Sequence, residues 1–195
     1  MLMEWDWQTV EFGGVHAGAV GVLIGGSVPG PVYFDVGSGP HVPSTTHWTV
    51  YDGRLRRPRA EALRAVCACG WQGAAEYPLD WAAIGDQALH EADIDLAGPL
   101  ADWTAHLSVV RDKAAPLPES LAALLVEIAD QLNTTAVDTP LAALRAAGVL
   151  ERIATRAGRA AAGMLDADVS AEAVAIALGT SRSKAAILLL TTPDR

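Results

Sequence analysis

The two cysteines of this 195-residue chain are separated by a single alanine, and this spacing constrains the fold more than any other feature. They belong to the run Cys67-Ala68-Cys69-Gly70-Trp71, in which the glycine can adopt the positive φ of a tight turn. Such a turn directs two thiolates toward one centre, and Zn²⁺ prefers thiolate and imidazole ligands in a tetrahedral arrangement. The sequence therefore predicts a metal-binding knuckle at Cys67 and Cys69.

Other uses of the two cysteines remain open from sequence alone. They can be buried thiols, since free cysteine packs as a small hydrophobic residue, or they can serve redox or catalytic chemistry. A disulfide between them is disfavoured because a loop of one residue strains the bond. The first residues, with Glu4 and Asp6, do not form a charged-then-apolar leader, so we expect no oxidising compartment.

Two cysteines supply half of a tetrahedral zinc shell, so histidines are expected to supply the rest. The region 47–106 resembles a group of uncharacterised bacterial proteins that carry Cys-x-Cys-Gly-Trp and, further on, Trp-x-x-His. The resemblance implies no known activity, but it makes His106 the third ligand. His47, in a predicted strand 47–51, is the first choice for the fourth ligand, and His90 is the alternative. The residues that match the group are Cys67, Cys69, Gly70, Trp71, Trp103 and His106.

The formal net charge of −9 disfavours a general electrostatic attraction to nucleic acid. The charge is uneven, however, because residues 141–195 carry seven basic and five acidic side chains. Five arginines between Arg54 and Arg64 form either a solvated edge or a patch that contacts phosphates. No apolar run reaches the roughly 18 residues that span a membrane, so we expect a cytoplasmic protein with no membrane contact.

The sequence predicts an α+β protein with two parts. A β-rich domain with the metal knuckle and short helices covers residues 1–113, and all six tryptophans lie in it. Residues 114–118 form a proline-containing linker, and residues 119–195 form an all-α domain rich in alanine and leucine. Helices are expected at about 81–92, 100–110, 119–132, 140–165, 171–178 and 181–190.

The last two of these helices resemble the helix-turn-helix regions of bacterial transcription factors. The resemblance covers residues 169–190 and is carried by Ala-x-x-Leu-Gly-x-Ser-Arg at 175–182, with Gly179 supplying the turn. It implies that the second helix enters the major groove of DNA and that Arg182 pairs with guanine. The residues that it assigns to DNA contact are Ser181, Arg182, Ser183 and Lys184.

These patterns favour a DNA-binding, transcriptional regulator-like protein with a structural zinc site and a possible homodimer. The alternative is a protein-interaction or dimerisation module, which the apolar run 187–190 supports. A zinc metalloenzyme with Glu61, Glu76 or His90 as base is less favoured, because the sequence has no recognisable catalytic constellation. The sequence thus predicts binding rather than catalysis.

Overall fold

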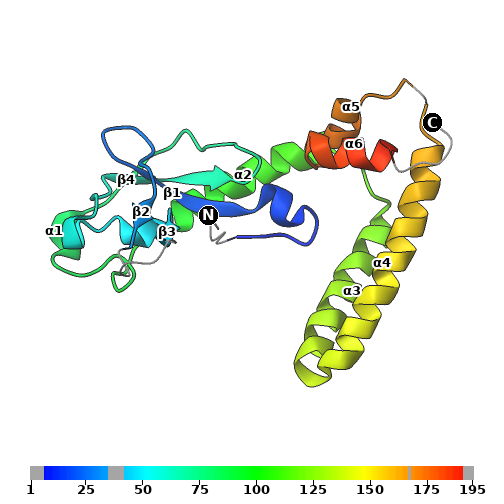
Figure 1. Cartoon of the computed structure of the whole chain (residues 1–195), viewed down its shortest axis with the longest axis horizontal. Helices are drawn as coiled ribbons and strands as arrows, with labels where there is room; N and C mark the ends of the chain where they lie inside the picture. Colours follow the sequence, from blue (N-terminus) through cyan, green and yellow to red (C-terminus); the bar gives the residue numbers. More distant parts are fainter. Residues whose placement is uncertain (1–6, 35–41, 167, 191–195) are drawn as a thin grey trace. The chain divides into compact units, whose positions relative to one another are not determined.

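The computed structural model describes residues 7–34, 42–166 and 168–190 (Figure 1). Among these residues, short antiparallel strands occupy the N-terminal part and most of the remainder is helical, in agreement with an α+β protein. The helices are α1 Trp81–Ile84, α2 Ala97–Lys113, α3 Glu119–Asp138, α4 Pro140–Gly163, α5 Ala171–Ala177 and α6 Arg182–Leu190.

The chain divides into two compact units. The first unit comprises Met1–Thr9 and Gly13–Ser108, and the second comprises Val10–Phe12 and Val109–Arg195. Residues 114–118, the predicted linker, contain neither helix nor strand and lie within the second unit.

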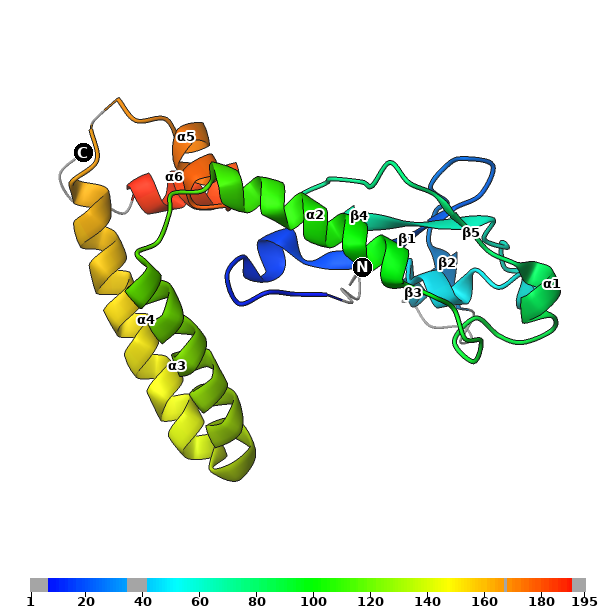
Figure 2. The ribbon, with the colours of Figure 1, turned by 180° about the vertical axis from the view of Figure 1, so that it is seen from behind.

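The first unit is built on the antiparallel pair β1 and β4, which Figure 2 shows with α2 running alongside. The register places Gly18 opposite Cys67 and Leu23 opposite Ala62. β5 pairs with the other edge of β4, while β2 and β3 form a separate two-stranded sheet. The strands are β1 Gly18–Leu23, β2 Val32–Tyr33, β3 Ser44–Thr45, β4 Ala62–Cys67 and β5 Tyr77–Pro78.

A hydrophobic core joins the strands of this unit to its loops. Tyr51, Leu63 and Leu89 are almost completely buried in it, and the Tyr51 hydroxyl donates a hydrogen bond to the Gly30 carbonyl at 2.8 Å. Many of the core residues lie outside helices and strands, so loops contribute much of the packing. The buried members are Val20, Val22, Val32, Trp48, Tyr51, Ala60, Leu63, Ile84 and Leu89.

Two predicted elements of this unit are wrong. The segment 47–51 is not a strand but contains a 3₁₀ helix, Trp48–Val50. Trp48 and Tyr51 are both buried and lie three residues apart, which places two side chains on the same face of a 3₁₀ helix. On a strand, side chains of the same face are two residues apart. The helix predicted at 81–92 stops after α1, because Gly85 adopts a φ of +62° and ends it.

In the second unit, α3 and α4 form a helical hairpin and are joined through Thr139 (Figure 1). The sequence predicted that α3 ends near Leu132, but the helix continues to Asp138. The hydroxyls of Thr134 and Thr135 donate to the carbonyls of Asp130 and Gln131, so these threonines are accommodated within the helix. The predicted start of α4 at Pro140 is confirmed.

α5 and α6 form a compact helix pair in this unit. The Ser170 hydroxyl caps α5 by accepting from the Ala173 amide, and the Ser181 hydroxyl accepts from the Lys184 amide at the start of α6. Gly179 has a φ of +54°, and a Cβ there would lie 2.7 Å from the Phe12 ring. Only glycine fits this turn without strain.

Among the described residues, no single helix combines the length and apolar character needed to cross a membrane. α5 and α6 meet those two criteria only when they are taken together as a bent pair.

Candidate metal centre

Four side chains of the first unit bring metal-ligating atoms to one point. The ligand atoms of His16, Cys67, Cys69 and His106 all lie within 4.8 Å of one another, and both cysteines are free thiols. The Cys67 sulfur is 3.7 Å from Nδ1 of His16, and the Cys69 sulfur is 3.4 Å from Nε2 of His106. A tetrahedral zinc ion separates sulfur and nitrogen ligands by roughly 3.5 Å. The group therefore has the composition and spacing of a Cys₂His₂ metal centre.

The knuckle itself is a tight turn at the end of β4. The Gly70 amide donates to the Cys67 carbonyl at 2.9 Å, and the Cys67 amide donates to the Trp71 carbonyl at 2.9 Å. Gly70 has a φ of +93°, which confirms the positive φ expected at this position. These bonds hold the two cysteine side chains on a rigid loop, as a metal site needs.

His16 reaches the centre through the pairing of β1 with β4. It ends a short 3₁₀ helix, Gly13–His16, two residues before Gly18, the partner of Cys67 in the register. The next residue also contacts the knuckle, because the Ala68 amide donates to the Ala17 carbonyl at 2.8 Å. His16 is buried, so its imidazole lies on the inner side of the group.

His106 is positioned by α2. Three residues before it, the indole of Trp103 is buried and donates to the His16 carbonyl at 3.1 Å. The Trp71 ring stacks on the His106 ring, with centroids 4.3 Å apart and planes 7° apart. Trp103 thus ties α2 to the start of β1, and Trp71 orients the imidazole from the knuckle side.

The structure brings together three of the four metal ligands expected from sequence: Cys67, Cys69 and His106. The fourth member of the group is His16, whereas His47 and the alternative His90 do not belong to it. Nδ1 of His47 instead lies 2.7 Å from the Thr49 hydroxyl, since the 3₁₀ helix turns this side chain toward its own loop. Sequence reasoning missed His16 because its proximity depends on which strand pairs with β4.

Burial changes the protonation of these ligands. It raises the pKa of the Cys67 thiol to about 11. Burial lowers the pKa of His16. Burial also lowers the pKa of His106, and the neighbouring His16 lowers it further by a smaller amount. Near neutral pH the imidazoles are therefore in the neutral form that binds metal, while Cys67 must lose a proton to do so.

We expect the binding of a metal ion by this group to release at least one proton near pH 7, because the Cys67 thiol with its raised pKa of about 11 must become a thiolate. The apparent affinity then rises with pH by about tenfold per unit for each proton displaced. Isothermal titration calorimetry of the metal-free protein in buffers of different ionisation enthalpy measures this release. A binding heat that is the same in all buffers would contradict the assignment of Cys67 as a ligand.

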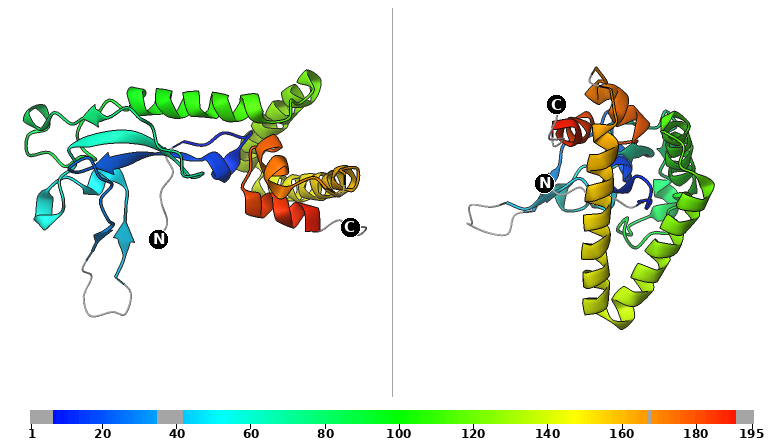
Figure 3. Two further views of the ribbon diagram at one scale, coloured as in Figure 1. Left: turned by 90° about the horizontal axis from the view of Figure 1, so that it is seen from above. Right: turned by 90° about the vertical axis from the view of Figure 1, so that its right-hand side faces the viewer.

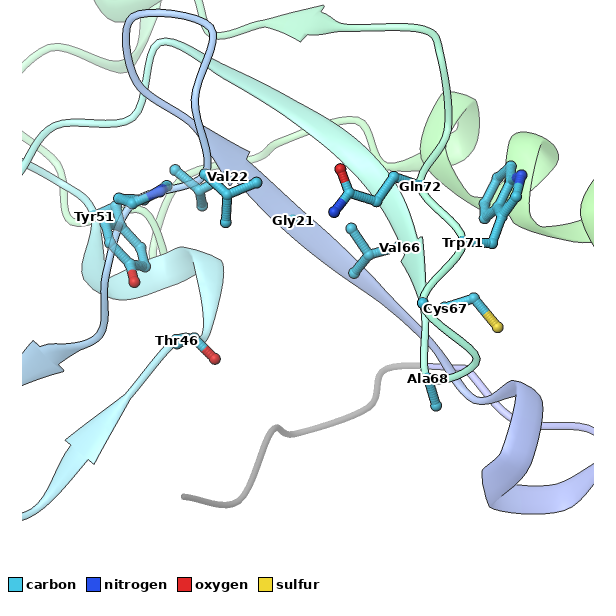
Figure 4. A pocket seen from close by; sticks show the side chains of 12 residues that line it. Gly21, Val22, Thr46, Tyr51, Val66, Cys67, Ala68, Trp71 and Gln72 are labelled. Carbon is cyan, nitrogen blue, oxygen red and sulfur yellow. The ribbon is translucent and has the colours of Figure 1, made fainter. Parts of the chain in front are cut away.

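A pocket of about 300 Å³ lies beside the knuckle. Val66 and Cys67 are neighbours in β4, so their side chains point to opposite sides of the strand. Figure 4 shows Val66 and Thr46 directed toward the pocket, whereas the thiol of Cys67 points away from it. This pocket therefore does not open onto the ligand atoms.

The residues predicted to contact DNA lie at the start of α6 in the second unit. Ser181, Arg182, Ser183 and Lys184 are all exposed, and Ala185 is the first buried residue of the helix. Ala185 packs with Val174 and Ala175 of α5, and Leu188 is partly buried against them. Leu178, just before the turn, is 52% exposed.

Three of the five arginines between Arg54 and Arg64 contact other side chains of the first unit. Arg57 pairs with the buried Asp52 at 2.9 Å, and Arg64 pairs with Glu76 at 2.8 Å. The Arg59 guanidinium lies 4.1 Å from the centre of the Trp81 ring. These contacts favour the interpretation of the run as a structural edge over that of a phosphate-binding patch.

Comparison with protein-family models, with curated proteins and with solved structures finds no match to this chain.

Proposed function

We propose that the metal centre binds Zn²⁺ in a structural role and that the helical unit binds DNA through a helix-turn-helix. The zinc assignment is supported by the ligand set, because two thiolates and two imidazoles are the donors of closed, four-coordinate structural zinc sites. A catalytic zinc keeps one position for water or substrate. Four protein ligands, and a neighbouring pocket that faces away from them, support the structural role.

The zinc would join three separate parts of the first unit. Cys67 and Cys69 belong to the knuckle at the end of β4, His16 precedes β1, and His106 lies on α2. Because these parts are otherwise joined by short strands and loops, one ion with four bonds contributes strongly to their stability. The unit is then expected to fold with its metal and to lose structure when a chelator removes it.

The single observation that best supports DNA binding is the geometry of α5 and α6. The chain bends by 113° between them, within the range of about 90–120° for helix-turn-helix pairs. The second helix of such a pair presents its first residues to base edges in the major groove. In α6 these residues are Arg182, Ser183 and Lys184, which are exposed and include two cations.

The DNA proposal is tested with the full zinc-loaded protein. We expect it to retain particular duplexes from a random library at low salt, with an affinity that falls steeply as salt increases. Arg182→Ala should weaken binding to a selected duplex by roughly 5- to 150-fold, the effect of losing one bidentate contact. Fluorescence anisotropy with labelled duplexes measures both effects.

Arg182→Lys is the matched control for charge. Lysine keeps the positive charge but lacks the planar fork of arginine, so affinity for unrelated duplexes should remain while preference for the selected sequence falls. If no duplex is retained at low salt, the DNA proposal is wrong. The exposed Ile187 and Leu190 of α6 would then favour the alternative, a protein-interaction module.

A further inference from the structure

The hairpin of α3 and α4 leaves most of its apolar side chains uncovered. The structure describes both helices completely, and α3 has no buried residue while α4 buries only Ala143 and Ala162. Helices in proteins are stabilised mainly by the packing of an apolar face against other parts of the protein. In this hairpin most of the apolar side chains lack such packing. The aliphatic side chains with the following exposed fractions illustrate this: Leu121 44%, Leu124 54%, Leu125 44%, Val149 41% and Ile153 49%.

An open groove runs between the two helices. The right-hand view of Figure 3 shows α3 and α4 diverging from the turn that joins them. The groove has a volume of about 480 Å³, and Ile128 and Leu132 of α3 line it together with Val149 and Leu150 of α4. The lining residues lie between 128 and 135 on α3 and between 142 and 150 on α4, and their aliphatic side chains suit the side chains of another helix.

The two helices carry opposite charges. α3 has four acidic side chains and no basic one, whereas α4 has four arginines and one glutamate. The arginines recur at helical spacing, so they form one stripe on α4 beside Val149 at the groove. These charged residues are Glu119, Glu127, Asp130 and Asp138 on α3, and Arg145, Arg152, Arg156 and Arg159 on α4.

We propose that this hairpin is a homodimerisation surface, in which α3 of each copy packs against α4 of the other to form a four-helix bundle. A two-fold contact requires a surface that is complementary to itself, and an acidic helix beside a basic helix on a shared apolar groove meets that requirement. Two copies of a chain with a net charge of −9 otherwise repel each other. Local pairing of opposite charges therefore selects this face for self-association.

The central charges fit this pairing in either direction of the hairpins. Glu127 and Asp130 lie near the middle of α3, and Arg152 and Arg156 lie near the middle of α4. When the α3 of one copy lies along the α4 of another, the middle of each helix lies opposite the middle of the other whether the two helices run parallel or antiparallel, so the acidic centre of α3 faces the basic centre of α4. The proposal does not depend on DNA binding, and its test uses the mass of the particle in solution.

The first test is the mass of the full zinc-loaded protein by light scattering after size exclusion. We expect twice the chain mass of 20.3 kDa. The double variant Leu124→Glu with Leu125→Glu should weaken the dimer by at least about 100-fold, because it places four carboxylates in the apolar contact. Val109→Glu is the control, since Val109 is 51% exposed, lies on α2 outside the hairpin and should leave the dimer intact.

The second test exchanges charges between the helices. One variant, Glu127→Lys with Asp130→Lys, makes the middle of both helices basic. The other, Arg152→Glu with Arg156→Glu, makes the middle of both helices acidic. Each variant alone should dissociate, because like charges then face each other. An equimolar mixture should form a heterodimer, because every α3–α4 contact between the two chains is again of opposite charge.

Recovery of the dimer in the mixture also shows that both variants fold. A wild-type monomer would overturn the proposal, and so would a dimer that survives Leu124→Glu with Leu125→Glu. If the two charge variants dissociate but do not combine, α3 does not pair with α4 of the other copy and the bundle is wrong. A wild-type complex that contains a different protein instead of a second copy overturns it as well.

Discussion

Cys67→Ser is expected to abolish stoichiometric zinc binding and to unfold much of the first unit. The substitution removes a buried ligand from a four-ligand centre, and a structural zinc contributes about 10–16 kcal/mol of binding free energy in small zinc domains. We expect the free energy of unfolding to fall by more than about 4 kcal/mol, as for other losses of a structural metal. Metal analysis of the purified protein and chemical denaturation measure the two effects.

Substitution of two histidines, one inside the group and one outside it, provides the control for this prediction. His16→Ala should lower zinc affinity strongly, since it removes the ligand that the structure adds to the group. His47→Ala should leave one zinc per chain, because His47 contacts Thr49 and is not part of the group. Equal zinc loss in the two variants, or full retention of zinc in Cys67→Ser, is incompatible with this centre.

Trp103→Ala is expected to destabilise the first unit by about 3–5 kcal/mol, the range for removing a buried tryptophan. The indole is 4% exposed, lies 5.7 Å from the Trp7 ring and donates to the His16 carbonyl. Its loss leaves a cavity and removes the contact that fixes α2, with His106, against the start of β1. Denaturation followed by circular dichroism gives the change in stability, and competition with a zinc-binding dye gives the accompanying loss of affinity.

Gly18→Ala tests the same contact from the strand side. A Cβ at Gly18 would lie 2.6 Å from the Trp103 ring, so this small change should also weaken zinc binding by displacing the indole. The exposed Val109 of the same helix α2 provides a control, and Val109→Ala should change zinc affinity little. If Trp103→Ala and Val109→Ala had equal effects, the role given to Trp103 would be wrong.

Half of the metal centre could be predicted from local sequence. Cys67, Cys69 and Gly70 form one turn, so their spacing alone determines where the thiolates point. His106 came from the resemblance to Trp-x-x-His proteins, and the structure places it in the group. His16 could not be found this way, because only the register of β1 with β4 brings it within reach of a residue 51 positions away.

The predicted elements were most accurate where helices are long. The starts of α3 and α4 follow from proline and an amphipathic pattern, which are local signals. Short elements of the first unit were wrong at 47–51 and 81–92, because burial of Trp48 and Tyr51 and the positive φ of Gly85 depend on tertiary packing. The DNA-contacting role of Ser181–Lys184 stays a prediction.

The segment Val10–Phe12 has a practical consequence for anyone who dissects this protein. Glu11 forms an ion pair with Arg111 at 2.8 Å, and Phe12 fills the space beside Gly179 at the turn between α5 and α6. A fragment that starts after α2 would lack both partners, and the turn would lose its aromatic neighbour. Truncation at the apparent domain boundary therefore removes part of the helical unit's own packing, and recombinant work should keep the chain whole.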